Sequence, residues 1–220
     1  MIKRLIFLLV VSSVLFACGV DRSKERIVGV IADSAMVVSA HPLASQIGVD
    51  ILKKGGNAVD AAIATQIALA VVHPSAGNLG GGGFMVLRKN DGSYHSLDYR
   101  EKAPAKATEN MYLDSAGNVV ENLSLRGGLA SGVPGSVAGW VESHVKHGSL
   151  PWKELVQPSI DLARNGFELT EKEAGGLNWI QEDLVKYNSV QPEFMLKEEW
   201  KQGDLFKLPE LAATLELIRD

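Results

Sequence analysis

The sequence of 220 residues contains one cysteine, five scattered histidines and no excess of positive charge, and each shortage excludes a class of protein. A lone cysteine cannot form a disulfide within the chain, so stability must come from core packing. No zinc-type spacing of cysteine and histidine occurs, and we expect no metal centre. The formal net charge of −4 provides no basic field to attract nucleic acid, so we expect no nucleic-acid partner.

The first 17 residues have the pattern of a secretory signal peptide. Lys3 and Arg4 form a positively charged start, and residues 5–16 form an apolar stretch. That stretch is shorter than the roughly 20 residues that a membrane-spanning helix requires. We therefore predict that residues 1–17 are a signal for export and not part of the fold.

The single cysteine, Cys18, follows this segment directly. Residues 15–18, Leu-Phe-Ala-Cys, resemble a bacterial lipobox, although Phe16 fits its position poorly. The motif predicts cleavage before Cys18, a lipid on its thiol and a tether over residues 18–30. It also predicts a protein anchored to the membrane in the bacterial periplasm or at the cell surface. An ordinary exported protein with an incidental cysteine is the alternative.

The remaining residues, 31–220, read as one domain of mixed helix and strand. Residues 31–38 are apolar and end in β-branched side chains, which favours a first strand. The spacing of apolar residues, with caps and stop residues, predicts helices over 42–54, 58–72, 136–147, 152–165, 170–186 and from 209 onward.

For three of these helices the sequence predicts more than the residue range. The helix over 58–72 is nearly apolar all round, so it should be buried within the protein. Pro158 should kink or break the helix over 152–165. The inward face of the helix over 136–147 should consist of Val137, Trp140, Val141 and Val145.

The stretch from 78 to 101 is where we expect one wall of a functional site. Four glycines, Gly80–Gly83, precede an apolar run at 84–87 that suits a strand buried on both faces. Residues 90–93 have the chemistry of a hairpin turn, and 94–100 should form the second strand. The hairpin would thus deliver Arg100, flanked by carboxylates, to the end of a sheet.

Other candidate sites in the sequence are weak. The glycine run lacks the spacing of a phosphate-binding loop, so close backbone packing is the better interpretation. His41 and His73 each precede a proline at a helix boundary, which indicates structural roles. His144 and His147 could meet on one helix face, but no carboxylate or cysteine pattern accompanies them to form a metal site.

Several stretches together resemble the γ-glutamyltransferase (glutathione hydrolase) family, specifically the front part of its precursor. They occur in the family's order: 38–44 (VSAHPLA), 55–62 (GGNAVDAA), 73–75 (HPS), 80–85 (GGGGFM), 98–101 (DYRE), 103–104 (AP), 132–136 (GVPGS) and 158–166 (PSIDLARNG). One such piece is weak evidence, whereas the ordered set is specific.

The resemblance implies an α+β fold of the N-terminal-nucleophile hydrolase type, an αββα sandwich of which only the N-terminal portion is present. It implies a precursor that cleaves itself into a large subunit and a C-terminal small subunit. The small subunit then begins with a threonine nucleophile, which takes the γ-glutamyl group of glutathione and passes it to water or to an amino acid or peptide. No cofactor or metal is implied.

This chain departs from the family because it ends before the processing site and the nucleophile. None of its threonines (Thr65, Thr108, Thr170 and Thr214) lies in the family's nucleophile motif, so no catalytic residue is expected here. The helix that begins at 209 runs to Asp220 without stop signals, which suggests a truncated chain. We expect a partial large subunit that is inactive alone.

The resemblance carries over one binding residue. Arg100 matches the family's arginine that binds the α-carboxylate of the glutamyl group, and a guanidinium offers a planar fork suited to a carboxylate. Asp98 is expected to orient Arg100. Two alternatives remain: a non-catalytic, truncated lipoprotein that keeps the family scaffold, and an acylase of the same superfamily that acts on another amide.

Overall fold

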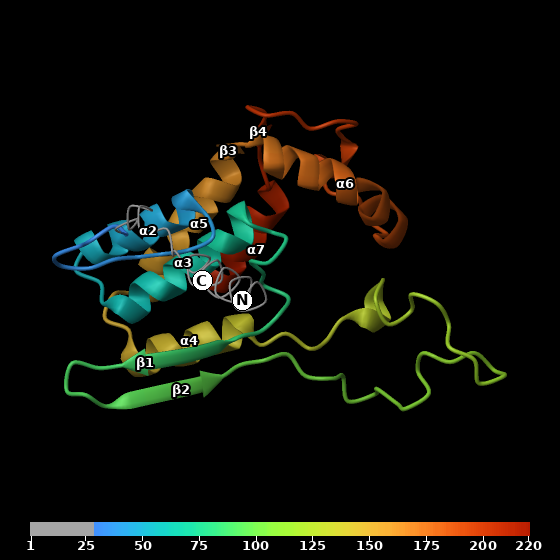
Figure 1. Ribbon diagram of the computed structural model, residues 1–220, viewed down its shortest axis with the longest axis horizontal. Coiled ribbons are helices and arrows are strands. Elements are labelled where there is room, and N and C mark those ends of the chain that lie inside the picture. Colours follow the sequence, from blue (N-terminus) through green and yellow to red (C-terminus); the bar gives the residue numbers. More distant parts are fainter. Residues whose placement is uncertain (1–28) are drawn as a thin grey trace, which may run out of the picture. The chain divides into compact units, whose positions relative to one another are not determined.

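Helix α3 (Ala58–Val72) lies at the centre of the core in the computed structural model, which describes residues 29–220 (Figure 1). Eleven of its fifteen residues are buried, as its continuous apolar sequence predicts. The signal peptide, Cys18 and most of the predicted tether lie outside the described residues. Residues 29–34 belong to a separate unit from residues 35–220 and contain no helix or strand.

Four helices within residues 35–220 build the core around α3. Helices α2 (Pro42–Lys53), α4 (Ser136–His147) and α5 (Trp152–Asn165) pack against it, and α7 (Pro209–Arg219) packs on α5. The remaining helical elements are α6 (Glu171–Tyr187), η1 (Gly128–Ala130) and η2 (Glu193–Leu196). Within residues 29–220, no helix is both long and apolar enough to cross a membrane.

The strands form two antiparallel pairs. The first is the predicted hairpin, in which β1 (Phe84–Arg88) pairs with β2 (Tyr94–Asp98) in the register Phe84 to Asp98. It lies beside α4 (Figure 1). The second pair joins β3 (Phe167–Glu168) to β4 (Leu205–Phe206) and has no signal in the sequence, because each strand is only two residues long.

The helix ends follow the capping residues of the sequence. His41 caps α2 by accepting the main-chain N–H of Leu43 at Nδ1, and Gly55 ends that helix at a positive φ of 92°. Asn57 and Asp60 form a reciprocal capping box at the start of α3. Thr170 and Glu173 form a second capping box, at the start of α6.

Two predictions about strands are wrong. Residues 31–38 form no strand, since apolar composition makes a strand only where a neighbour accepts its hydrogen bonds, and none does within residues 29–220. Residues 84–87 are not buried on both faces, because the hairpin has two strands and packs one face on α4. Phe84 and Val86, on the other face, are 60% and 82% exposed.

Two predictions about helices also need correction. Pro158 does not break α5, which is a continuous helix from residue 152 to 165, and a kink there stays a prediction. In α4, Val141 and Val145 are exposed, and the buried residues are Trp140 and the small Ser136, Gly139 and Ser143. The hairpin approaches α4 so closely that small residues, not valines, occupy the contact face.

Asp60 is a fully buried carboxylate whose oxygens are satisfied by donors from two segments. It accepts the main-chain N–H of Asn57 at 2.9 Å and that of Leu150 at 3.3 Å. The hydroxyl of Ser149 donates at 2.5 Å, and the N–H of the same residue lies 3.1 Å from the other oxygen. Asp60 therefore joins the start of α3 to the connection between α4 and α5.

We expect Asp60→Ala to lower the free energy of unfolding by about 3 kcal/mol or more, because several buried donors lose their acceptor at about 1–3 kcal/mol each. Thermal or urea unfolding of the purified protein measures the loss. Asp161→Ala is the control: Asp161 is exposed, accepts one hydrogen bond from Gln157 and should change stability by less than about 0.5 kcal/mol. Equal effects of the two variants would contradict the structural role of Asp60.

Candidate substrate-binding site

The hairpin ends in Tyr99, a buried residue that lies between the glycine run and α4. Its main-chain N–H donates to the carbonyl of Gly83 at 3.0 Å, and its own carbonyl accepts the N–H of Gly83 at 3.4 Å. Strand β2 stops at Asp98, two residues before the predicted end at Arg100. Arg100 therefore follows a fixed residue and is not itself part of the strand.

Glycines surround Tyr99 because no side chain would fit. A Cβ atom at Gly135 would lie 2.0 Å from the Tyr99 carbonyl oxygen, and one at Gly139 would lie 2.2 Å from its ring. At Gly83 a Cβ would lie 2.8 Å from the same ring. We call Gly83, Gly135 and Gly139 the Tyr99 seat. Atoms this close would have to move, so the seat lets the main chain and the ring of Tyr99 pack directly against the glycine run and α4.

The glycine run is also tied to the start of α4. The carbonyl of Gly81 accepts the N–H groups of Gly135 at 2.8 Å and Ser136 at 3.1 Å. The Asn78 amide oxygen accepts the N–H of Gly81 at 2.7 Å and the hydroxyl of Ser136 at 3.2 Å. The prediction of close backbone packing is confirmed for Gly81 to Gly83, whereas a Cβ at Gly80 would meet nothing within 4 Å.

The Arg100 side chain is 65% exposed, and its Nε lies 4.0 Å from a carboxylate oxygen of Glu101. A pair at this distance in solvent is weak, so the guanidinium remains available to an incoming ligand. Asp98 accepts the main-chain N–H of Arg100 at 3.0 Å. The structure thus brings Asp98 and Arg100 together through the main chain, and a contact of Asp98 with the guanidinium stays a prediction.

A cavity of about 220 Å³ lies beside Tyr99 on the side of α3. Its polar lining includes Gln66, Asn78 and Ser136. The Gln66 amide oxygen accepts both the hydroxyl of Tyr99, at 3.3 Å, and the indole N–H of Trp140. The sequence analysis placed Trp140 on the inward face of its helix, as found, but gave Gln66, Tyr99 and Trp140 no role at the site. An amide within an otherwise apolar helix was the signal that could have pointed to Gln66.

The gamma-glutamyltranspeptidase family model matches residues 44–220. The chain belongs to this family. It is 46% identical over 191 residues to the glutathione hydrolase proenzyme of Escherichia coli, with 86% of this chain and 33% of that protein covered. The chain therefore spans about a third of the length of the curated relatives it matches.

Solved structures agree with this membership. The crystal structure of Helicobacter pylori gamma-glutamyltranspeptidase matches with a TM-score of 0.81 and 45% identity, over 87% of this chain and 56% of that one. A cephalosporin acylase from Bacillus halodurans matches with a TM-score of 0.70 and 26% identity, over 89% of this chain and 38% of that one. The predicted fold class, α+β of the N-terminal-nucleophile hydrolase type, is confirmed.

His41 contacts a carboxylate but has no free ring nitrogen for chemistry. Its Nδ1 accepts the N–H of Leu43 at 3.2 Å, so Nε2 carries the proton and donates to Glu173 at 2.9 Å. Burial raises the pKa of Glu173, but hydrogen bonds from Thr170 and the contact with His41 outweigh it and lower the pKa overall. The pair joins α2 to α6, in agreement with a structural role.

His144 and His147 do not form the pair that their spacing allows. A ring nitrogen of His144 contacts the carbonyl of Leu150 at 2.7 Å, whereas the ring of His147 lies 4.8 Å from that of His95 on β2. Burial lowers the pKa of His147, and the positive charges of His95, Lys89 and Lys146 lower it further. Within residues 29–220, no group of three or more candidate ligands could hold a metal ion.

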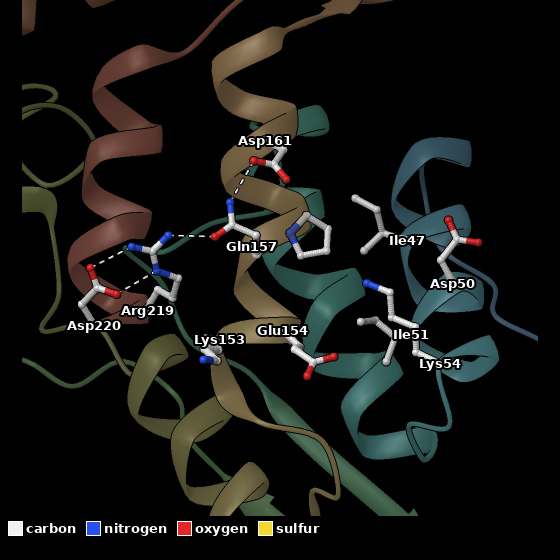
Figure 2. Close-up of a pocket in the computed structure, with 11 residues that line it drawn as sticks. Ile47, Asp50, Ile51, Lys54, Lys153, Glu154, Gln157, Asp161, Arg219 and Asp220 are labelled. Carbon is white, nitrogen blue, oxygen red and sulfur yellow. Dashed lines mark hydrogen bonds and ion pairs between the residues drawn. The ribbon is translucent and has the colours of Figure 1, made fainter.

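The cavity shown in Figure 2, of about 930 Å³, lies between α2, α5 and the end of α7. The Arg219 guanidinium faces this cavity and donates hydrogen bonds to Gln157 at 2.8 Å and to Asp220 at 2.8 Å. The rest of the lining contains both cations and carboxylates, including Lys54 and Glu154. A lining of mixed charge favours neither an anionic nor a cationic ligand. Arg100 is therefore a better candidate than this cavity for binding a carboxylate.

We expect Gly139→Ala to destabilise the protein by about 1–3 kcal/mol, because the new methyl group overpacks the ring of Tyr99. Gly175→Ala is the matched control. Gly175 lies in α6 with nothing within 4 Å of its Cβ position, so alanine should stabilise that helix by roughly 0.5–1 kcal/mol. The two midpoints of thermal unfolding should therefore move in opposite directions, and a neutral Gly139→Ala would contradict the Tyr99 seat.

The stability of the protein should fall as the pH drops below about 6.5, in part because of His147. Its pKa is lower in the folded state than in the unfolded chain, so the unfolded chain binds the proton more tightly. The contribution of His147 is complete above the unfolded pKa and is lost towards the folded one. Urea unfolding at pH 5.5, 6.5 and 7.5 measures the slope, which His147→Gln should reduce. An unchanged slope in this variant would contradict the assignment.

Proposed function

We propose that this chain supplies the large-subunit part of a glutathione hydrolase and that Arg100 binds the α-carboxylate of the γ-glutamyl donor. The exposed guanidinium of Arg100, held at the end of the hairpin by a buried Tyr99, is the observation that carries the proposal. Membership of the family supports the class of reaction. Glutathione and other γ-glutamyl compounds are the proposed donors.

The role of Arg100 is recognition and not chemistry. A guanidinium donates two parallel hydrogen bonds to a carboxylate, and such charge-assisted bonds are short and strong. The neighbouring Glu101 carboxylate, at 4.0 Å, offers only a weak competing pair. A donor's α-carboxylate can therefore replace that pair at little cost. The proposed nucleophile, a threonine, lies outside this chain.

The proposed partner is the C-terminal small subunit of the same precursor. The relatives are described as proenzymes, which supports a precursor that is processed into two subunits. The threonine at the start of the small subunit would accept the γ-glutamyl group and release it to water or to an amino acid or peptide. For the precursor as a whole we propose export, with Cys18 lipidated at the membrane surface.

We expect Arg100→Ala, in the full-length precursor, to raise the KM for a γ-glutamyl anilide by roughly tenfold to a hundredfold. The loss of charge-assisted hydrogen bonds worth about 1.5–3 kcal/mol accounts for this change. The kcat and the self-cleavage should change much less, because Arg100 touches neither the scissile amide nor the nucleophile in this proposal. Steady-state hydrolysis of the anilide and gel analysis of the subunits measure both.

Two controls make this experiment specific. The first is a donor that lacks the α-carboxylate, the 4-aminobutyryl anilide, whose KM should not respond to Arg100→Ala. The second is Arg88→Ala, which removes an exposed arginine from β1 of the same hairpin and should leave both KM values unchanged. If Arg100→Ala has the same effect on both donors, Arg100 does not bind the carboxylate.

Reading the DNA downstream of codon 220 distinguishes the proposed enzyme from the non-catalytic alternative. An open frame that continues to a threonine-led motif supports the enzyme, whereas a stop codon supports a scaffold without catalysis. The fold is shared with a cephalosporin acylase at 26% identity, which keeps an acylase as a second candidate. Such an enzyme, without a carboxylate clamp, would show similar KM values for the two anilides, whereas the proposed enzyme should have a lower KM for the γ-glutamyl anilide.

A further inference from the structure

We propose that Gln66 on α3 positions Arg100 for the donor's carboxylate by holding the hydroxyl of Tyr99, and that Trp140 fixes the Gln66 amide for this purpose. This inference rests on the role proposed above for Arg100. It concerns three residues that we place behind the binding surface. They are positioning residues, because they act on the donor only through the place of Arg100.

The orientation of the Gln66 amide follows from the chemistry of its partners. An indole N–H can only donate, so the atom that faces Trp140 must be the amide oxygen. The same oxygen lies 3.3 Å from the Tyr99 hydroxyl, which therefore donates to it. One acceptor thus joins three elements: α3, α4 and the end of the hairpin.

The base of this connection is rigid. Gln66 lies in α3 between residues that are fully buried, including Ile63 and Ile67. Trp140 is only 2% exposed, so its indole has little room to rotate. Because both donors and the acceptor come from packed elements, the hydrogen bonds fix a position and do not follow a mobile side chain.

The Gln66–Tyr99 hydrogen bond ties the hairpin to the core. Among the described residues, no other hydrogen bond joins residues 80–101 to α3. The Tyr99 seat holds the tyrosine against the glycine run and α4, whereas Gln66 holds the far end of its ring. Arg100 is the next residue, so a shift of Tyr99 moves the origin of the guanidinium. A bidentate contact tolerates such a shift poorly.

The test measures the KM and kcat for two donors, the γ-glutamyl anilide and the 4-aminobutyryl anilide, in variants of the full-length precursor. Gln66→Leu removes the acceptor, Tyr99→Phe removes one donor and Trp140→Phe removes the other. Each should raise the KM for the γ-glutamyl anilide by roughly threefold to tenfold. Tyr99→Phe and Trp140→Phe each lose one neutral hydrogen bond, whereas Gln66→Leu loses both and should lie at the upper end of this range. The kcat should be nearly unchanged, and the KM for the 4-aminobutyryl anilide should stay at its original value.

Matched controls remove the same groups elsewhere in the chain. Trp152→Phe deletes an indole N–H that donates to the carbonyl of Ile218 at 2.9 Å, away from the hairpin. Tyr112→Phe deletes a hydroxyl that donates to the carbonyl of Leu129 at 3.1 Å. Neither should change the KM for either donor, even if thermal stability falls as much as in the test variants.

Each outcome decides between the two proposals. A rise in KM for the carboxylate-bearing donor alone supports the positioning role. An unchanged KM, or an equal rise for both donors, overturns it, because a general loss of structure would not distinguish the donors. If Arg100→Ala discriminates between the donors and the Gln66, Tyr99 and Trp140 variants do not, only the positioning proposal fails. If Arg100→Ala itself does not discriminate, both proposals fail.

Discussion

The close approach of α4 to Tyr99 is the constraint on which the rest of this region depends. A methyl group at Gly135 or Gly139 would overlap the main chain or the ring of Tyr99, so the contact exists only because both positions are glycine. The carbonyl of Gly81 then meets the first N–H groups of α4. Through these contacts the hairpin, the glycine run and α4 become one rigid support for Arg100.

Rigid support matters because the proposed ligand contact is geometric as well as electrostatic. A guanidinium recognises a carboxylate through two parallel hydrogen bonds, and its own flexible stem must be ordered when the ligand binds. Fixing the main chain of the preceding residue leaves only this side chain to be ordered when the ligand binds. The buried Asp60 and the His41–Glu173 pair extend the same support by fixing the ends of α2, α3 and α6.

Local patterns in the sequence predicted the helices and the hairpin well, because caps, glycine stops and apolar spacing act within a few residues. They failed where the outcome depends on distant residues. Val141 and Val145 are exposed because Gly139, which packs on Tyr99, and the buried Ser143 occupy the inward face of α4. The hairpin pattern and the motif made Arg100 a candidate, because both are local. The hydrogen bond between Gln66 and Trp140 joins residues 74 positions apart, so no local pattern could predict it.

In our proposal, Arg100 is positioned by Tyr99 and binds the α-carboxylate of the donor. A crystal structure of the full-length enzyme with bound L-glutamate tests it most directly. We expect two N–O distances of about 2.7–2.9 Å between the Arg100 guanidinium and the α-carboxylate, with Tyr99 buried in its seat. An α-carboxylate bound by other groups, while Arg100 stays beside Glu101, would contradict it.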